Sequence, residues 1–292
     1  MKRSYWRVSG VALVIMAATM FTHAQDQRAQ WNAPQAPFRV FGNTYYVGPH
    51  GLSSILITSS SGHVLIDGAL PESAAMIVDN VRRLGFRIED VKLILNSHAH
   101  YDHAGGLGEL QRLSGARVAA TLPSARVLQQ GRSGPDDPQY GTLPDMARID
   151  QVEPVSDGQT LRVGSLELTA HATGGHTPGG TSWTWKSCEN DRCVDVVYVD
   201  SVTAVSADGF AFTRSKEYPT ALRDFEKSFA FLEATPCDLL LTPHPEASDL
   251  WGRLAKRDQG DRDALIDAGA CRRFSEAARR RFRARIEAEQ KP

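Results

Sequence analysis

The chain of 292 residues carries 33 basic and 34 acidic residues, for a formal net charge of −1, and 41% of its residues are hydrophobic. Nothing in this charge balance suggests a nucleic-acid partner, and a chain with this share of hydrophobic residues and no low-complexity tract can bury one large core. Chains of this length that mix helices and strands commonly form one large domain, which is what we expect here.

The first 24 residues have the form of a secretory signal peptide. Three basic residues precede an apolar run from Val11 to Phe21, and the small-x-small sequence at 22–24 matches the site that signal peptidase cuts. The apolar run is shorter than the roughly 20 residues that a membrane span needs. We therefore expect a secreted, periplasmic domain over residues 25–292 that has no membrane anchor. Loss of the three basic residues changes its net charge from −1 to −4.

The first half of this domain begins with strands and then alternates helices with strands. Residues 38–48 and 53–68 show strand alternation between Gly, Asn and Ser breaks. A helical period over 71–86 starts at Pro71 and stops at Gly85. The elements expected next are a buried strand, a helix, a strand and a helix with Ser124 as its N-cap, over 91–97, 106–113, 116–121 and 124–131.

The second half repeats this organisation. Strands are expected within 161–174, 181–187 and 194–200, then a helix over 219–234, a buried strand over 237–244 and an arginine-rich helix from about Asp261. Two β-sheets packed together, with helices outside them, would bury the apolar faces of both halves. We expect the arginine-rich helix to be a solvated surface.

Residues 131–150 contain turn residues throughout and show no hydrophobic period. Unstructured stretches of this length inside a domain are usually functional loops or disordered segments. We favour a flap that faces the substrate.

The four cysteines of an exported chain predict disulfides before they predict a metal site. Cys188 and Cys193 enclose a polar four-residue turn, which leaves Cys237 and Cys271 to pair with each other. A zinc site made of four thiolates is disfavoured because the spacings contain no CxxC pair.

The stretch NSHAHYDHAGG, from Asn96 to Gly106, places three histidines and one aspartate within six positions at the end of a predicted buried strand. Imidazole nitrogen and carboxylate oxygen suit Zn²⁺. His98 and His100, two positions apart, can face one ion, whereas Asp102 and His103 more naturally face a second.

The missing ligands must come from distant segments. His176 stands among glycines that permit close backbone approach, and His244 lies between two prolines that fix its turn. For His50, His63 and His171 we favour structural roles, and His23 would leave with the signal peptide.

The motif HxHxDH, together with the two later histidines, resembles the metallo-β-lactamase superfamily. Within that superfamily, the segments GHTPGGTSWTW, VYVDSVTAVSADGF and CDLLLTPHPEAS closely resemble subclass B3, and the likeness runs from about Trp31 to about Arg273. The resemblance implies a four-layer αββα sandwich and two Zn²⁺ ions per chain. It implies that the first zinc is held by His98, His100 and His176, and the second by Asp102, His103 and His244.

The same resemblance implies a small-molecule substrate and an activity. A zinc-bound hydroxide, formed because the metal lowers the pKa of water from 15.7 to about 7, would hydrolyse the β-lactam amide of penicillins, cephalosporins and carbapenems, giving antibiotic resistance. Asp102 would orient the hydroxide. Ser201 and Thr203 would bind the substrate carboxylate, because no lysine or arginine follows these two residues before Arg214 and their hydroxyls are the nearest side-chain donors. Gln139 would contact the rest of the molecule. We expect a monomer.

Two alternatives remain open in the sequence. Another hydrolase of the superfamily, acting on a thioester or lactone, would use Asp200 as a bridging ligand, and a non-catalytic zinc-binding domain would have closed metal sites. A serine β-lactamase is excluded because the chain contains no Ser-x-x-Lys. Asp67, at a predicted strand end, is a candidate partner that positions the histidine cluster.

Overall fold

The side chains of Tyr46 and Trp183 are fully buried between two β-sheets that pack face to face. The computed structural model describes residues 26–291, so the predicted signal peptide lies outside the described residues. Residues 26–31 form a short helical segment before the first strand. Within the described residues, no helix is both long and apolar enough to cross a membrane.

The larger sheet has seven strands in the order β1-β2-β3-β4-β5-β6-β7. Its strands are β1 (Phe38–Phe41), β2 (Thr44–Tyr46), β3 (Ile55–Ile57), β4 (His63–Ile66), β5 (Val91–Leu95), β6 (Arg117–Thr121) and β7 (Val152–Val155). The smaller sheet has the order β12-β11-β10-β9-β8. Its strands are β8 (Thr160–Val163), β9 (Leu166–Ala172), β10 (Thr181–Glu189), β11 (Arg192–Tyr198) and β12 (Leu239–Leu241).

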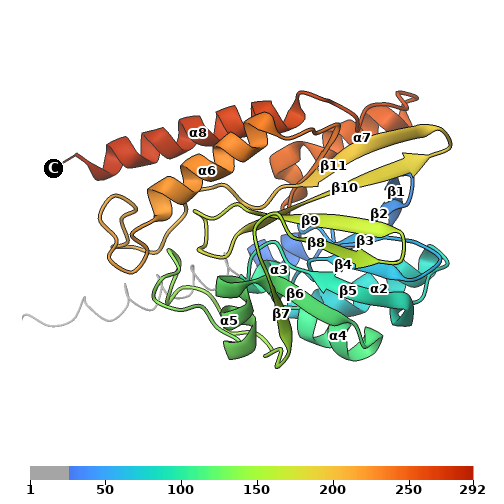
Figure 1. The fold of residues 1–292 in the computed structure, drawn as a ribbon, viewed down its shortest axis with the longest axis horizontal. Helices are drawn as coiled ribbons and strands as arrows, with labels where there is room; N and C mark the ends of the chain where they lie inside the picture. Colours follow the sequence, from blue (N-terminus) through green and yellow to red (C-terminus); the bar gives the residue numbers. More distant parts are fainter. Residues whose placement is uncertain (1–25, 292) are drawn as a thin grey trace, which may run out of the picture.

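Helices cover the outer face of each sheet (Figure 1). The larger sheet carries α2 (Ala74–Arg83), α4 (Leu107–Ser114) and α5 (Leu122–Gln130), and the smaller sheet carries α6 (Ala221–Ala234) and α8 (Ala270–Glu289). The helix α7 (Leu250–Asp258) packs instead against the core between the sheets, to which Leu250 and Trp251 belong. Single turns of helix occur at α3 (Tyr101–Ala104), η1 (Pro71–Ser73), η2 (Ile88–Asp90) and η3 (Pro245–Ser248). The predicted αββα sandwich is therefore confirmed.

The strands explain why the layers form, since successive side chains point to opposite faces of a sheet. Ile55 and Ile57 pack in the core between the sheets, whereas Leu56 between them packs in the core under the helices of the larger sheet. In the smaller sheet Val196 faces the other sheet and Val197 faces α6 and α8. The strand β3 and the last residues of β11 are therefore buried on both faces, whereas β9 over residues 166–171 places buried residues on one face and exposed or half-buried residues on the other.

Several element predictions differ from the structure. The strand β7 and the helix α7 were not predicted, and the arginine-rich helix begins at Ala270 rather than near Asp261. Ser124 lies inside α5 rather than at its N-cap, because that helix begins at Leu122 with a proline in its first turn. The Ser124 hydroxyl instead donates to the Gly179 carbonyl at 3.0 Å.

The structure joins Cys188 to Cys193 and Cys237 to Cys271. The first disulfide links directly opposed residues of β10 and β11. The second connects the segment before β12 to the start of α8 and therefore fixes α8 on the smaller sheet.

Candidate metal centre

The carboxyl ends of four strands carry the candidate site residues to one edge of the sandwich. β4 and β5 are parallel neighbours in one sheet, and β11 and β12 are parallel neighbours in the other. Asp67 follows β4 and the histidine cluster follows β5, while Asp200 follows β11 and His244 follows β12. The loop between β9 and β10 adds His176. Residues far apart in sequence therefore converge there.

Asp67 anchors the start of the cluster loop. Its carboxylate accepts hydrogen bonds from the Ser97 backbone N–H at 2.7 Å, the Ser97 hydroxyl at 2.6 Å and the Tyr198 hydroxyl at 2.8 Å. The side chain is fully buried and its φ is 60°, a conformation that an aspartate adopts uncommonly. Asp67 thus ties the loop after β5 to β11 in the other sheet.

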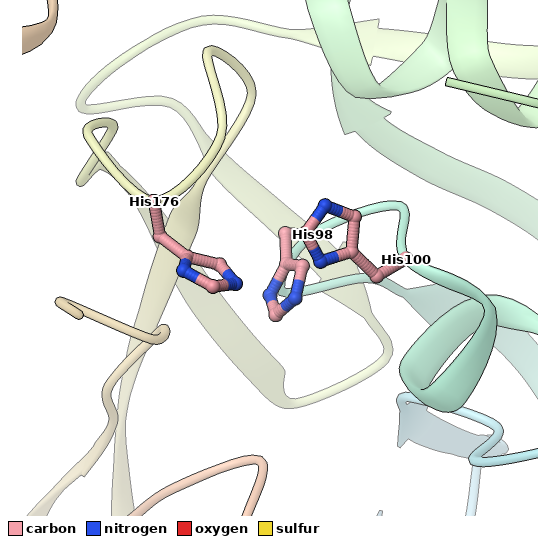
Figure 2. Close-up of side chains that lie close together, drawn as sticks. All are labelled: His98, His100 and His176. Carbon is pink, nitrogen blue, oxygen red and sulfur yellow. The ribbon is translucent and has the colours of Figure 1, made fainter. Parts of the chain in front are cut away.

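His98, His100 and His176 form the first cluster of ligand-type side chains. One ring nitrogen from each lies within 4.8 Å of the other two, and all three residues are buried. Figure 2 shows the three rings turned toward one another, with His176 approaching from the β9–β10 loop and the other two from the loop after β5. The ring centroids of His98 and His100 are 4.6 Å apart.

Each of these rings has an acceptor at one nitrogen, which leaves the other nitrogen for a metal. His98 Nδ1 lies 2.6 Å from Asp200 Oδ1, and His100 Nε2 lies 2.9 Å from Asp137 Oδ2. His176 Nδ1 lies 2.9 Å from the Thr203 carbonyl oxygen. Metal-ligating histidines almost always donate their second N–H to such an acceptor, so this donor set fits a metal ion.

Asp102, His103 and His244 form the second cluster. Asp102 Oδ2 lies 3.2 Å from His103 Nε2 and 3.4 Å from His244 Nε2. The ring centroids of His98 and His103 are 4.5 Å apart, so the two clusters are adjacent. Asp102 and His103 stand on the single helical turn α3, whose N-cap residue is His100. This turn brings both side chains close to that of His244, whose ring centroid lies 4.8 Å from that of His103.

Burial controls the ionisation of these groups. Burial lowers the pKa of His98 well below its ordinary value, and it lowers the pKa of His176 to about 3 with a further contribution from His100. Both rings are therefore neutral at pH 7, as ligation requires. Burial opposes ionisation of Asp102, yet His103 and His244 outweigh it and hold the pKa of this carboxyl well below its ordinary value.

Asp200 does not bridge the two clusters. Its fully buried carboxylate contacts the His98 ring, and burial raises its pKa well above the ordinary value for an aspartate. Among the described residues, the two groups of candidate ligands do not include it. The alternative that assigned Asp200 a bridging role, as in a thioesterase, is therefore not supported. His50, His63 and His171 belong to neither cluster.

The two clusters open into a cavity of about 940 Å³. All three predicted substrate-contacting residues, Ser201, Thr203 and Gln139, line it. The Gln139 amide nitrogen lies 3.5 Å from His176 Nε2. The Thr203 hydroxyl lies 3.2 Å from His176 Nδ1, so part of its hydrogen-bonding capacity is directed at the candidate ligand rather than at the cavity.

The loop 131–150 contributes Gln139 and Leu143 to the cavity wall. It also contains Asp137, which is buried against His100 and which we did not predict from the sequence. A lone aspartate among turn residues gives no periodic or motif signal. Its burial in a polar loop could be found only from the three-dimensional contact.

The arginine-rich helix was expected to be a solvated surface, and this expectation is wrong in part. Phe274 and Arg281 of α8 line the cavity. The reason is that α8 packs on the smaller sheet beside the loop that follows β11. A cation separated by about 80 residues of sequence from Ser201 therefore lies on the wall of the same cavity.

A family model and two solved structures relate this chain to metallo-beta-lactamases. A family model described as the metallo-beta-lactamase superfamily matches residues 47–266. The solved structure of Rm3 metallo-beta-lactamase is 57% identical, covers 90% of this chain and 98% of its own, and superimposes with a TM-score of 0.89. MEM-A1, described as a subclass B3 metallo-beta-lactamase isolated from a soil metagenome library, is 50% identical with a TM-score of 0.87 over 89% of this chain and 98% of its own.

A more distant relative is the uncharacterized protein YobT of Bacillus subtilis, which is 32% identical over 145 residues. The match covers 48% of this chain and 59% of YobT, so the chain spans less than two thirds of that relative. The similarity to the two solved structures, by contrast, extends over nearly their whole length.

Proposed function

The chain belongs to the metallo-β-lactamase superfamily and, within it, to subclass B3, and from this premise we propose that its cavity hydrolyses β-lactam antibiotics with two zinc ions bound. The observation that carries the proposal is the pair of adjacent three-ligand clusters at the cavity wall. Three protein ligands per ion leave a coordination position open, which is the arrangement of catalytic rather than structural zinc sites.

The proposed ligands of the first zinc are His98, His100 and His176, and those of the second are Asp102, His103 and His244. When bound, the zinc pair would supply hydroxide at neutral pH and stabilise the negative charge that develops on the oxygen and nitrogen of the opening amide.

The remaining residues position the reactants. The low pKa of Asp102 keeps its carboxylate ionised. The carboxylate can therefore accept a hydrogen bond from the attacking water and orient the lone pair of that water toward the lactam carbonyl. The Ser201 hydroxyl donates a hydrogen bond to the substrate carboxylate, and the Gln139 amide borders the rest of the substrate. Penicillins, cephalosporins and carbapenems, which carry this carboxylate, are the proposed substrates.

The decisive experiment measures turnover of one carbapenem, one penicillin and one cephalosporin by the purified protein. We expect hydrolysis that stops on chelation and returns with added zinc. A thioester and a lactone serve as comparison substrates for the other hydrolases of the superfamily. Turnover of either, with none of the three β-lactams hydrolysed, would overturn the proposal.

We also propose that the leader is removed near Gln25 and that the mature domain acts in the periplasm as a monomer. The two disulfides support an oxidising compartment, since such bonds persist outside the cytosol. N-terminal sequencing and sizing of the protein purified from a periplasmic extract test the cleavage site and the oligomeric state together.

A further inference from the structure

One cationic side chain lines the cavity without a role in the proposed metal centre. Arg281, on α8, is the one lysine or arginine among the described residues that form the cavity wall. Phe274 lies two turns earlier on the same helix and lines the same cavity, so one face of α8 borders the site.

The Arg281 guanidinium is free to bind an anion. Three other arginines of α8 each have a carboxylate partner: Arg273 pairs with Asp267, Arg279 with Glu233 and Arg285 with Glu289. For Arg281, no ion-pair or hydrogen-bond partner occurs within residues 26–291. The positions three and four residues away on the helix hold alanine or arginine, so α8 itself offers it no acid.

The neighbouring turn of α8 shows which segment Arg281 borders. Arg285, one turn further along the same helix face, donates to the Ala204 carbonyl at 3.2 Å. Residues 201–205, which include Ala204, supply Ser201, Thr203 and Val205 to the cavity wall. Arg281 therefore lies beside the segment that carries the predicted carboxylate-binding hydroxyls.

Among the described side chains that line the cavity, only Arg281 offers a fixed positive charge to a carboxylate bound at that segment. Ser201 offers a neutral hydroxyl, and the Thr203 hydroxyl is partly engaged with His176. A guanidinium matches a carboxylate with parallel N–H donors and carries a charge at every physiological pH.

We propose that Arg281 is a specificity-determining residue that binds the carboxylate next to the ring nitrogen of the β-lactam substrate. The proposal rests on the proposed β-lactamase function. It deepens that function by assigning the charge recognition to a residue of the C-terminal helix.

The first test compares a penicillin with its carboxylate methyl ester in steady-state kinetics of the zinc-loaded protein. The variants are Arg281→Ala, Arg281→Lys and the matched control Arg280→Ala, which removes the same charge from an exposed arginine outside the cavity wall. We expect Arg281→Ala to raise KM for the acid about fivefold, with kcat and zinc content unchanged and with little effect on the ester. Arg281→Lys should restore part of the loss, and Arg280→Ala should resemble the wild type.

The second test requires no turnover, so its result is independent of the proposed function. Trp31 lines the cavity, and its fluorescence should report binding of the acid or the ester to the metal-free protein. The wild type and Arg280→Ala should bind the acid more tightly than the ester, and Arg281→Ala should lose that difference.

A preference for the acid that survives in Arg281→Ala, in either test, would overturn the assignment, as would an equal weakening of acid and ester. A wild type that shows the acid preference in binding but hydrolyses no β-lactam would overturn the proposed function and leave the carboxylate assignment supported.

Discussion

Asp200 Oδ1 lies 2.6 Å from His98 Nδ1, within hydrogen-bond distance, and both side chains are buried. Asp200 follows β11 of the smaller sheet and His98 follows β5 of the larger one. This contact therefore fixes the tautomer and the orientation of the His98 ring across the interface between the sheets.

Asp200→Asn should weaken zinc binding at the first cluster about tenfold, because a neutral amide replaces the carboxylate behind a ligating histidine, and changing such a partner typically costs that much affinity or more. The measurement is competition for zinc with a chromogenic chelator. Asp195→Asn, which removes the same charge from a carboxylate that pairs with Lys186, is the control and should bind zinc like the wild type. Unchanged zinc affinity in Asp200→Asn would contradict the assigned role.

The metal stoichiometry provides a second prediction. The wild type at saturating zinc should hold two ions per chain, and His176→Ala and His244→Ala should each retain about one, because each removes one of three ligands from a different cluster. His171→Ala, which changes a histidine outside both clusters, should retain both ions. Elemental analysis that finds one ion in the saturated wild type would refute the two-site assignment.

How much of the site the sequence could predict depends on the kind of signal that each residue carries. His98, His100, Asp102 and His103 form a dense motif, and His176 stands in a glycine-rich turn, so the chemistry is visible in short segments. The layers were predictable for a similar reason, since strand and helix periods record which faces are buried.

Asp137 and Arg281 could not be found in this way. Asp137 acts through a single contact with His100, and Arg281 through the position of a whole helix beside residues 201–205. Both depend on how separate elements pack, and no local period encodes that packing. The strand β7 escaped prediction for a related reason, because Pro154 lies inside its four residues and proline is rare within strands.

The two disulfides should differ in their contribution to stability. On the chain-entropy estimate, removing the Cys237–Cys271 bridge should lower the free energy of unfolding by about 4 kcal/mol, and removing Cys188–Cys193 by about 2 kcal/mol, because the first closes the longer loop. The two double Cys→Ala variants are compared by urea unfolding under non-reducing conditions. A larger loss from the short bridge would contradict the estimate.

The end of α8 should contribute stability that depends on pH. Burial opposes ionisation of Glu289, but the Thr213 backbone N–H and the Arg285 guanidinium outweigh it and lower the pKa of this carboxyl. A lowered folded-state pKa gives stability that is present above the unfolded pKa of about 4.3 and is lost as pH falls through the folded value.

Glu289→Gln should therefore lower the free energy of unfolding by about 1 kcal/mol at pH 7, and the difference from the wild type should shrink toward zero in acid. Denaturant titrations at several pH values measure it. Glu287→Gln, at an exposed position of the same helix, is the control and should have little effect at any pH. An equal destabilisation by Glu289→Gln at pH 7 and in acid would show that the charge is irrelevant.

Substitutions at Ser201 and Thr203 should have different effects on KM, although the sequence suggested one shared role for the two hydroxyls. The Ser201 hydroxyl lines the cavity, whereas the Thr203 hydroxyl lies 3.2 Å from His176 Nδ1 and the Thr203 carbonyl lies 2.9 Å from the same atom. Ser201→Ala should raise KM for a carbapenem about tenfold and change kcat less, because a hydrogen bond to a charged acceptor is lost from substrate binding. Thr203→Val keeps the carbonyl that holds His176, so zinc content should be unchanged and the rise in KM smaller than for Ser201→Ala.

The measurements are steady-state kinetics and metal analysis of each single variant. A loss of zinc in Ser201→Ala, or an unchanged KM, would show that this hydroxyl serves the metal centre or the fold rather than the substrate.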